Sequence, residues 1–219
     1  MLRTLHLTNV TLFQQVELHF SPGLNVFVGE NGSGKSQLLK LAYVMAACLQ
    51  DPLPTRSVLQ SLLADKLVAV MSPEALGRLV RRRAGRERAE LVAHWGVSDE
   101  PLKFRFATNS RSEVVVEAMP DHPLNKRPCF IPTRELLTIA PGFVALYESR
   151  VLEFEETWRD TCLLLQAPAL RGARQQQIQA LLAPLEQAMG GQVESDQNGR
   201  FYLRQPGGRL EMPLVAEGL

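Results

Sequence analysis

The alternation of apolar and polar residues predicts two short strands at the start of the chain. Residues 2–10 alternate regularly, and a second alternating run covers residues 16–20. The continuous apolar run "LNVFVG" at residues 24–29 follows a Ser-Pro-Gly turn and predicts a buried strand. The apolar positions from Ser36 to about Leu49 suit a buried helix, and "DPLPT" after them predicts its end.

The middle of the chain predicts a helical block followed by short strands. Residues 57–94 are helical in character, with a break near "SPEALG". There, Ser72, Pro73 and Glu74 have the residue types of a helix cap, a first-position proline and an acidic first turn. Three strand candidates follow: "KFRFAT" from Lys103, "EVVVEA" from Glu113 and "PCFIP" from Pro128.

The last third of the chain predicts helices and then a small β meander. Residues 136–188 are mostly helical in pattern, with an interruption near "QAPALRG". The segments after them predict a meander near residues 191–215, with turns at Asn198-Gly199 and Gly207-Gly208. The order of elements predicts an α/β fold in one domain over residues 1–219, with a helical insertion near residues 51–97.

Composition narrows the class of protein. With 219 residues, 45% of them hydrophobic, the chain can bury one substantial core. The net charge of +1 creates no global field toward nucleic acid or membrane. The three cysteines show no paired metal spacing, and no apolar run approaches the roughly 20 residues of a membrane span. A soluble, cytoplasmic protein without membrane contact is expected.

The run "GENGSGKS" at residues 29–36 carries the chemistry. It fits the pattern GxxxxGK[ST] at every fixed position, between an apolar run and a helix pattern. Glycines permit the positive φ angles that turn backbone N–H groups inward as an anion nest, and the following helix points its positive end at phosphates. The bland alternative is a glycine-rich turn with an accidental lysine.

This loop predicts a site for ATP and Mg²⁺. Lys35 would reach the β- and γ-phosphates, and the Ser36 hydroxyl would bind Mg²⁺. The predicted binding residues are Gly29, Glu30, Asn31, Gly32, Ser33, Gly34, Lys35, Ser36 and Gln37.

The same region resembles a known family. The stretch "LHLTNVTLF…VELHFSPGLNVFVGENGSGKSQLLKLA" is similar to the opening of ABC-type ATPases of the RecF, SMC and OLD kind. The later segments "CFIPTRELLTI" and "PLVAEGL" resemble a narrower group of bacterial AAA-labelled, OLD-like ATPases, some of which act in anti-phage systems with a nuclease partner.

The resemblance implies a P-loop fold in which two ATPase heads, as two copies or two different chains, sandwich ATP. Each composite site would use the phosphate loop of one head and a signature helix of the other. It also places Arg134, after the "CFIP" run, where a polar residue senses the γ-phosphate or Mg²⁺. The alternative for Arg134 is a surface ion pair or a helix start.

The chain departs from the family pattern in its later parts. It contains no run of four apolar residues followed by Asp-Glu, no LSGGQ-like signature and no assignable switch histidine. The chain is therefore predicted to be the N-terminal lobe of such an ATPase, cut short or divided between two chains. It would bind ATP–Mg²⁺ but turn it over poorly, because phosphoryl transfer relies on the missing groups for positioning and charge stabilisation.

Other features have a functional and a plain interpretation. The run Arg78–Arg88 holds six arginines and one glutamate, so it is either a nucleic-acid contact or a solvated helix face. The resemblance places Asn9 and Phe13 on the adenine side, although an aromatic near a sheet is usually core. Trp158 fits helix packing better than a cofactor role.

Two further function classes stay open. A GTPase should carry Asn-Lys-x-Asp, and "NKRP" at Asn125 has Pro128 where the aspartate belongs. A small-molecule kinase would also use the P-loop. In the third class, a non-catalytic interaction module, nucleotide only shapes a surface for a partner.

Overall fold

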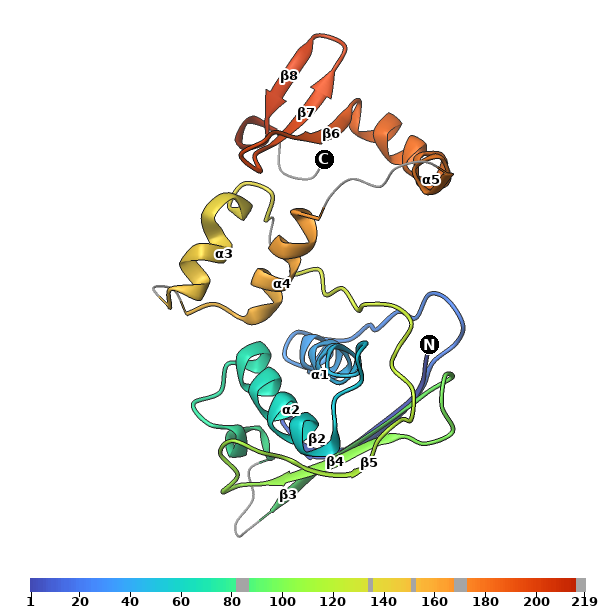
Figure 1. Ribbon diagram of the computed structural model, residues 1–219, viewed down its shortest axis with the longest axis vertical. Helices are drawn as coiled ribbons and strands as arrows, with labels where there is room; N and C mark the ends of the chain where they lie inside the picture. Colours follow the sequence, from blue (N-terminus) through green and yellow to red (C-terminus); the bar gives the residue numbers. More distant parts are fainter. Residues whose placement is uncertain (82–86, 134–135, 151–152, 168–172, 216–219) are drawn as a thin grey trace. The chain divides into compact units, whose positions relative to one another are not determined.

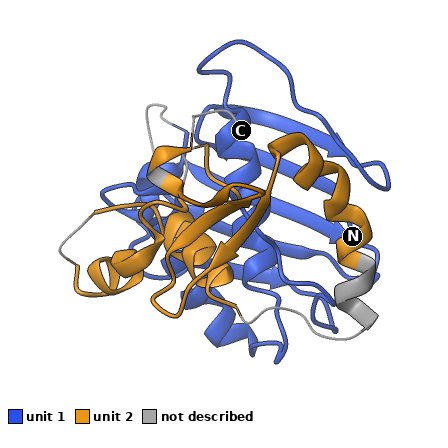
Figure 2. Ribbon diagram, turned by 90° about the horizontal axis from the view of Figure 1, so that it is seen from above, with its two compact units in different colours: residues 1–130 blue, residues 131–219 orange. Residues whose placement is uncertain are grey.

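Two antiparallel sheets, built from separate parts of the chain, organise the structure. The computed structural model describes residues 1–81, 87–133, 136–150, 153–167 and 173–215. It divides into two compact units, residues 1–130 and residues 131–219, coloured separately in Figure 2. The predicted α/β class is confirmed. That both units belong to one ATP-binding domain stays a prediction.

The first unit is built on a five-stranded sheet, and all of its neighbouring strands are antiparallel. In sheet order the strands are β2 (Phe13–His19), β1 (Leu2–Val10), β3 (Arg88–Trp95), β4 (Leu102–Ala107) and β5 (Val115–Ala118). Alternate side chains of β1, β3 and β4 are buried, as the two-residue period of a strand requires. One face of the sheet therefore belongs to the core.

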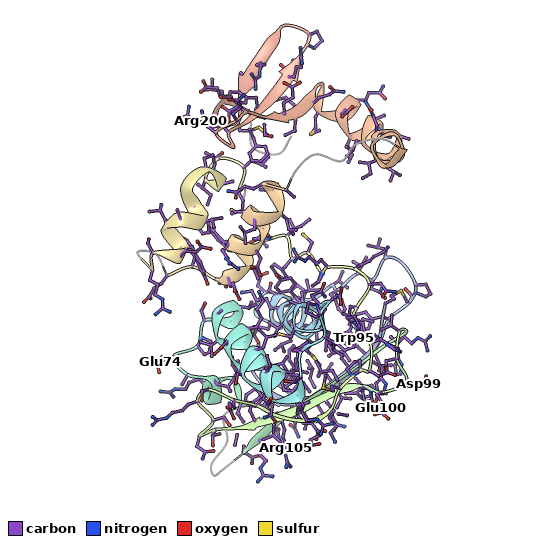
Figure 3. The ribbon with its side chains drawn as sticks, in the orientation of Figure 1. Glu74, Trp95, Asp99, Glu100, Arg105 and Arg200 are labelled. Carbon is purple, nitrogen blue, oxygen red and sulfur yellow. The ribbon has the colours of Figure 1, made fainter. Side chains whose placement is uncertain are left out.

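Two helices cover that face, as Figure 1 shows. They are α1 (Lys35–Ala47) and α2 (Arg56–Met71), and they pack against each other. Leu41 and Met45 of α1, Leu63 and Leu67 of α2, and Phe104 of β4 are all fully buried in this core. Figure 3 shows side chains filling the space between these helices and the sheet. The predicted helix over residues 36–49 is confirmed.

The central strand β3 corrects the prediction of helix up to His94. Ala and Leu in "RAELVAHW" favour a helix in isolation, but Ala89, Leu91 and Ala93 alternate toward the core. The strand pairs with β1 on one side and with β4 on the other. Pairing on both edges, together with burial of alternate side chains, outweighs the small propensity difference.

The connection after α2 also differs from the prediction. Ser72 does not begin a helix: its backbone N–H donates to the Val68 oxygen at 2.9 Å, and its φ of 51° ends α2. A single 3-10 turn, Leu76–Leu79, follows. Gly77 within it packs directly against the backbone carbonyl of Thr108, where no β-carbon would fit.

The predicted buried strand at residues 24–29 is wrong. Within the described parts of the chain this segment pairs with no strand. Phe27 packs toward the core against Phe20, with ring centroids 6.1 Å apart, but Leu24, Val26 and Val28 are 86%, 70% and 87% exposed. The segment is apolar, yet only one of its sides is covered.

The candidate strand "PCFIP" at residues 128–132 behaves in the same way. It belongs to no described sheet. Phe130 packs on Tyr43 of α1, with centroids 5.7 Å apart, whereas Ile131 is 81% exposed. Both apolar runs are predicted as strands, and in both cases the prediction is wrong, because no described strand lies beside them to pair with.

The second unit combines three helices with the predicted meander. The helices are α3 (Ala140–Glu148), α4 (Glu156–Leu165) and α5 (Ala173–Met189), and the strands are β6 (Gln192–Ser195), β7 (Phe201–Gln205) and β8 (Gly208–Glu211), followed by the 3-10 turn Met212–Leu214. The meander is antiparallel in the order β6-β7-β8. A Gly199 φ of 74° and a Gly208 φ of 135° mark its two turns, as predicted.

Aromatic contacts hold α3 and α4 together. The ring centroid of Phe143 lies 6.1 Å from that of Trp158 and 5.5 Å from that of Phe154. Phe154 stacks on Trp158, with 4.8 Å between their ring centroids. Cys162 is fully buried in the same cluster, and burial raises the pKa of its thiol. Trp158 therefore has the packing role expected of it.

Within the described ranges, none of the helices combines the length and the apolar character needed to span a membrane.

Truncating a side chain that is fully buried in the core of the first unit should greatly lower the free energy of unfolding. Phe104→Ala removes a fully buried ring and should cost about 3–5 kcal/mol of unfolding free energy, measured by urea denaturation. Val115→Ala, at a half-exposed position on β5, should cost about 0.5 kcal/mol or less. Equal losses for the two variants would contradict this account of the core.

Candidate nucleotide-binding site

The glycine-rich loop runs directly into the first turn of α1. Gly34 is the helix N-cap, with a φ of 91°, and Gly32 has a φ of 80°. Side-chain-bearing residues rarely adopt these angles, so glycine is needed at both positions. The positive φ angles turn the loop directly into the N-terminus of α1.

Phe13, at the start of β2, lies against this turn. A β-carbon placed on Gly34 would be 2.7 Å from the Phe13 ring and 3.6 Å from Leu12. Gly32, in contrast, has open space where a side chain would go. The β1–β2 hairpin therefore supports the loop at Gly34 and leaves Gly32 open.

Lys35 folds back over the loop. Its ammonium donates to the carbonyl oxygens of Gly29 at 2.7 Å and Glu30 at 2.8 Å, with the Ser33 hydroxyl at 3.5 Å. The positive charge is thereby held over the turn itself. This is a position from which the same group could pair with an anion at the loop.

The N-terminus of α1 fits an anion. The first helical bond runs from the Leu38 amide to the Gly34 oxygen at 2.9 Å, so the amides of Lys35, Ser36 and Gln37 have no acceptor inside the helix. No side chain caps this end. Free amides and the helix dipole together favour a phosphate here.

Two polar side chains complete the loop region. Ser36 is exposed at the start of α1, where its hydroxyl could reach a cation bound beside a phosphate. The Oε1 atom of Gln37 is buried and has no hydrogen-bond partner among the described residues. Within those residues no cluster of three or more His, Cys, Asp or Glu forms a metal site. The roles assigned to residues 29–37 stay predictions.

Arg134, the predicted sensor, lies outside the described residues, as does Glu135. The final "AEGL" segment, residues 216–219, also lies outside them.

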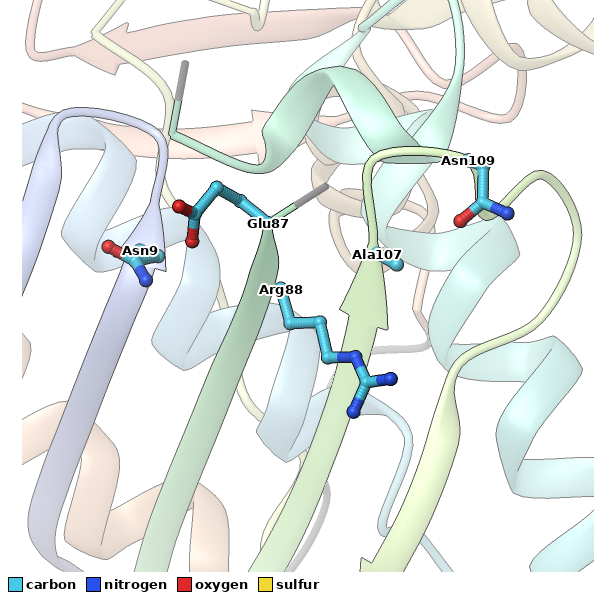
Figure 4. Close-up of a pocket in the computed structure, with 5 residues that line it drawn as sticks. All are labelled: Asn9, Glu87, Arg88, Ala107 and Asn109. Atoms are coloured by element: carbon cyan, nitrogen blue, oxygen red, sulfur yellow. The ribbon is translucent and has the colours of Figure 1, made fainter. Parts of the chain in front are cut away.

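A separate cavity of about 540 Å³ lies at one end of the five-stranded sheet. Figure 4 shows its lining residues Asn9, Glu87, Arg88, Ala107 and Asn109, on or next to the ends of β1, β3 and β4. Only Asn9 and Arg88 were singled out from the sequence. The pairing of β3 with β1 brings Glu87 to the end of β1 that carries Asn9, and the pairing of β3 with β4 adds Asn109. No sequence pattern indicates this cavity, because it depends on strand pairing.

The arginines of the predicted basic run, residues 78–88, lie in different surroundings. Arg78 pairs with Glu74 at 3.0 Å, and Arg81 donates to the Gln14 side chain at 3.2 Å. Arg88 lies in the cavity, while residues 82–86 are outside the described ranges. Two of the arginines thus have local protein partners, and a nucleic-acid contact stays a prediction.

Comparison with known proteins gives short matches at the N-terminal end. The AAA domain family AAA_23 matches residues 4–41. The DNA replication and repair protein RecF of Phocaeicola vulgatus is 40% identical over 47 residues, which are 22% of this chain and 13% of that protein. RecF of Latilactobacillus sakei subsp. sakei is 44% identical over 45 residues, 20% of this chain and 12% of that protein.

The matched segment thus spans about an eighth of the length of these RecF proteins. A solved structure described as "structural biochemistry of ATP-driven dimerization and DNA stimulated activation of SMC ATPases" aligns over 85% of this chain and 95% of that one. Its sequence identity is 16% and its TM-score is 0.37. The predicted resemblance to RecF-like P-loop ATPases is confirmed for the N-terminal segment.

Support of the loop by Phe13 predicts unequal effects at two glycines. Gly34→Ala strains a positive φ and clashes with the Phe13 ring, so it should cost about 1–3 kcal/mol of unfolding free energy and weaken nucleotide binding. Gly32→Ala meets only the φ penalty and should cost less.

The contact itself is tested by a double-mutant cycle, with thermal or urea denaturation as the measurement. In a Phe13→Ala background, Gly34→Ala should lose less stability than in the parent chain. Strict additivity of the two substitutions would contradict the contact.

Proposed function

We propose that this chain is the ATP–Mg²⁺-binding lobe of an ABC-type ATPase of the RecF and OLD-like kind, acting in the cytoplasm. The observation that carries the proposal is the loop of residues 29–36 at the open N-terminus of α1, with Lys35 held over it. Free amides, a helix dipole and a lysine converge on one point. That combination favours a polyphosphate over a neutral ligand.

Each residue has a distinct task in this proposal. The amides of Lys35, Ser36 and Gln37 donate to phosphate oxygens, and Lys35 exchanges its carbonyl acceptors for the β- and γ-phosphates. Ser36 supplies one oxygen ligand to Mg²⁺, which neutralises phosphate charge when it is bound. Phe13 holds Gly34 in place from outside the loop, and its ring is also a candidate contact for the adenine.

Hydrolysis is proposed to need elements supplied from elsewhere, by another part of the protein or by a second chain. The extended segment that leads into the loop supports this idea, because its outer side exposes Leu24, Val26 and Val28. An apolar segment that pairs with no strand among the described residues can pair with an added strand. Such a strand would also be a suitable carrier for the acidic groups that the phosphate loop lacks.

The wider setting is proposed from the family resemblance. RecF is named as a DNA replication and repair protein, and the SMC structure is described by ATP-driven dimerization and DNA stimulation. For this chain we accordingly propose pairing of two ATPase heads around ATP and an action on DNA. The resemblance of "CFIPTRELLTI" to OLD-like proteins extends the proposal to anti-phage defence with a nuclease partner.

Loss of the lysine charge is the test of nucleotide binding. Lys35→Ala should weaken ATP–Mg²⁺ binding by about 10- to 100-fold in isothermal titration calorimetry, because charge-assisted hydrogen bonds to phosphate are lost. Lys126→Ala removes the same charge from an exposed loop of the same unit and should leave the affinity unchanged. Failure of the parent chain to bind ATP, or equal affinities for the three proteins, would overturn the proposal.

Base selectivity separates this proposal from a GTPase. Asn125 and Lys126 lie on an exposed loop, and Pro128 occupies the place of the guanine-binding aspartate. In a competition assay, ATP should therefore displace a labelled nucleotide at least as well as GTP does. A clear preference for GTP would favour the GTPase alternative.

A further inference from the structure

The turn between β1 and β2 holds a residue in a strained conformation. β1 ends at Val10 and β2 begins at Phe13, so Thr11 and Leu12 form the turn. Thr11 has a φ of 51°, in the left-handed region that β-branched residues rarely adopt. Its hydroxyl oxygen is buried and has no hydrogen-bond partner among the described residues. A threonine does not favour this conformation by itself, so the neighbouring structure imposes it.

The bracing segment, residues 79–81, lies beside this turn and holds its backbone. The Thr11 amide donates to the Leu79 oxygen at 2.7 Å, and the Arg81 amide donates to the Asn9 oxygen at 2.8 Å. Between these two bonds lies an antiparallel β-bridge whose two valines are buried. The backbone is therefore fixed on both sides of the last residue of β1, as in one step of a β ladder.

The bracing segment is itself anchored at both ends. The 3-10 turn that leads into it is tied to the end of β4, because the Gly77 amide donates to the Ser110 oxygen at 3.1 Å. At the other end the Arg81 guanidinium donates to the Gln14 side chain of β2 at 3.2 Å. The segment can therefore hold the turn in place without moving along with it.

The opposite side of the turn faces the phosphate loop. A β-carbon on Gly34 would lie 2.7 Å from the Phe13 ring and 3.6 Å from the Leu12 side chain. Gly34 is the N-cap of α1, and Lys35 follows it directly. A series of direct contacts thus runs from the bracing segment, through the turn, to the start of the proposed nucleotide site.

We propose that the bracing segment positions the phosphate loop for nucleotide binding, an inference that rests on the proposed function. It keeps Thr11 in its strained conformation and thereby keeps Leu12 and Phe13 against Gly34. The loop then has its binding conformation before ATP arrives, and affinity rises because less order is lost on binding. Arg81 is a positioning residue in this account: its backbone amide acts through the turn, without touching the nucleotide.

Two substitutions at one position isolate the backbone hydrogen bond. Arg81→Pro removes the amide that donates to Asn9, and the Val80 ψ of 133° already suits a residue before proline. Arg81→Ala is the matched control, because it loses the same side chain and retains the amide. Arg81→Pro should bind ATP–Mg²⁺ about three- to tenfold more weakly than Arg81→Ala in isothermal titration calorimetry. Equal affinities of the two folded variants would overturn the proposal.

A double-mutant cycle separates positioning from a general loss of stability. In a Phe13→Ala background the ring that transmits the effect is absent, so Arg81→Pro and Arg81→Ala should differ far less in ATP affinity. Their difference in unfolding free energy, measured by urea denaturation, should persist in both backgrounds. An affinity difference of the same size with and without Phe13 would contradict a role through the turn.

Hydrogen exchange of the parent chain tests the same coupling without any substitution. ATP–Mg²⁺ should slow exchange of the Thr11 and Arg81 amides, because a coupling between two sites is reciprocal. The control is the Gly96 amide, which donates to the Met1 oxygen at the other end of β1 at 2.9 Å and should not change. Equal slowing of all three amides would indicate global stabilisation and overturn the proposal. This measurement decides the question if Arg81→Pro does not fold.

Exchange without nucleotide distinguishes this proposal from the proposed function. The Leu38 amide, which donates to the Gly34 oxygen at 2.9 Å, should exchange faster in Arg81→Pro than in Arg81→Ala. A parent chain that binds no ATP, with this difference present in its variants, would overturn only the proposed function. Identical Leu38 exchange in the two folded variants would overturn the positioning role, whether or not ATP binds.

Discussion

The packing of α1 on the inner face of the five-stranded sheet is the contact on which the first unit depends. Leu41, Val44 and Met45 of this helix are fully buried, and burying each such side chain stabilises the fold by about 1.5–3 kcal/mol. The same helix begins at Lys35, directly after the glycine-rich turn. The core therefore sets where the phosphate loop lies and which way its amides point. At position 34 only glycine fits against the Phe13 ring.

The two faces of the five-stranded sheet differ in polarity and in their contribution to stability. On the outer face Lys103 pairs with Glu90 at 3.3 Å and with Glu117 at 3.1 Å, and Arg105 pairs with Glu117 at 3.0 Å. The hydrogen bond from Lys103 lowers the pKa of the Glu117 carboxyl, but pairs this exposed contribute little to stability. The stability comes from the inner face. The polar outer face keeps the sheet in water, with a cavity at one end beside Asn9 and Arg88.

The sequence predicts the structure of a segment where the residues of that segment alone decide its conformation. The glycines and the lysine of residues 29–36 specify a turn into a helix, and the structure has that turn. The meander was predictable because Asn198-Gly199 and Gly207-Gly208 demand tight turns; there Asp196 accepts from the amides of Arg200 and Asn198, which lowers the pKa of its carboxyl. Trp158 was likewise recognisable as a packing residue from its helical surroundings.

The composition and the order of residues determined the α/β class, the place of the phosphate loop and the chemistry it could perform. Only the tertiary structure decided that residues 88–95 form a central strand, because that outcome depends on partners from β1 and β4 far away in the chain. Tertiary structure likewise decided that residues 24–29 are half exposed. Hydrophobicity requires that a segment be covered, but it does not state by what, and an apolar strand is buried only where a neighbour exists to pair with it.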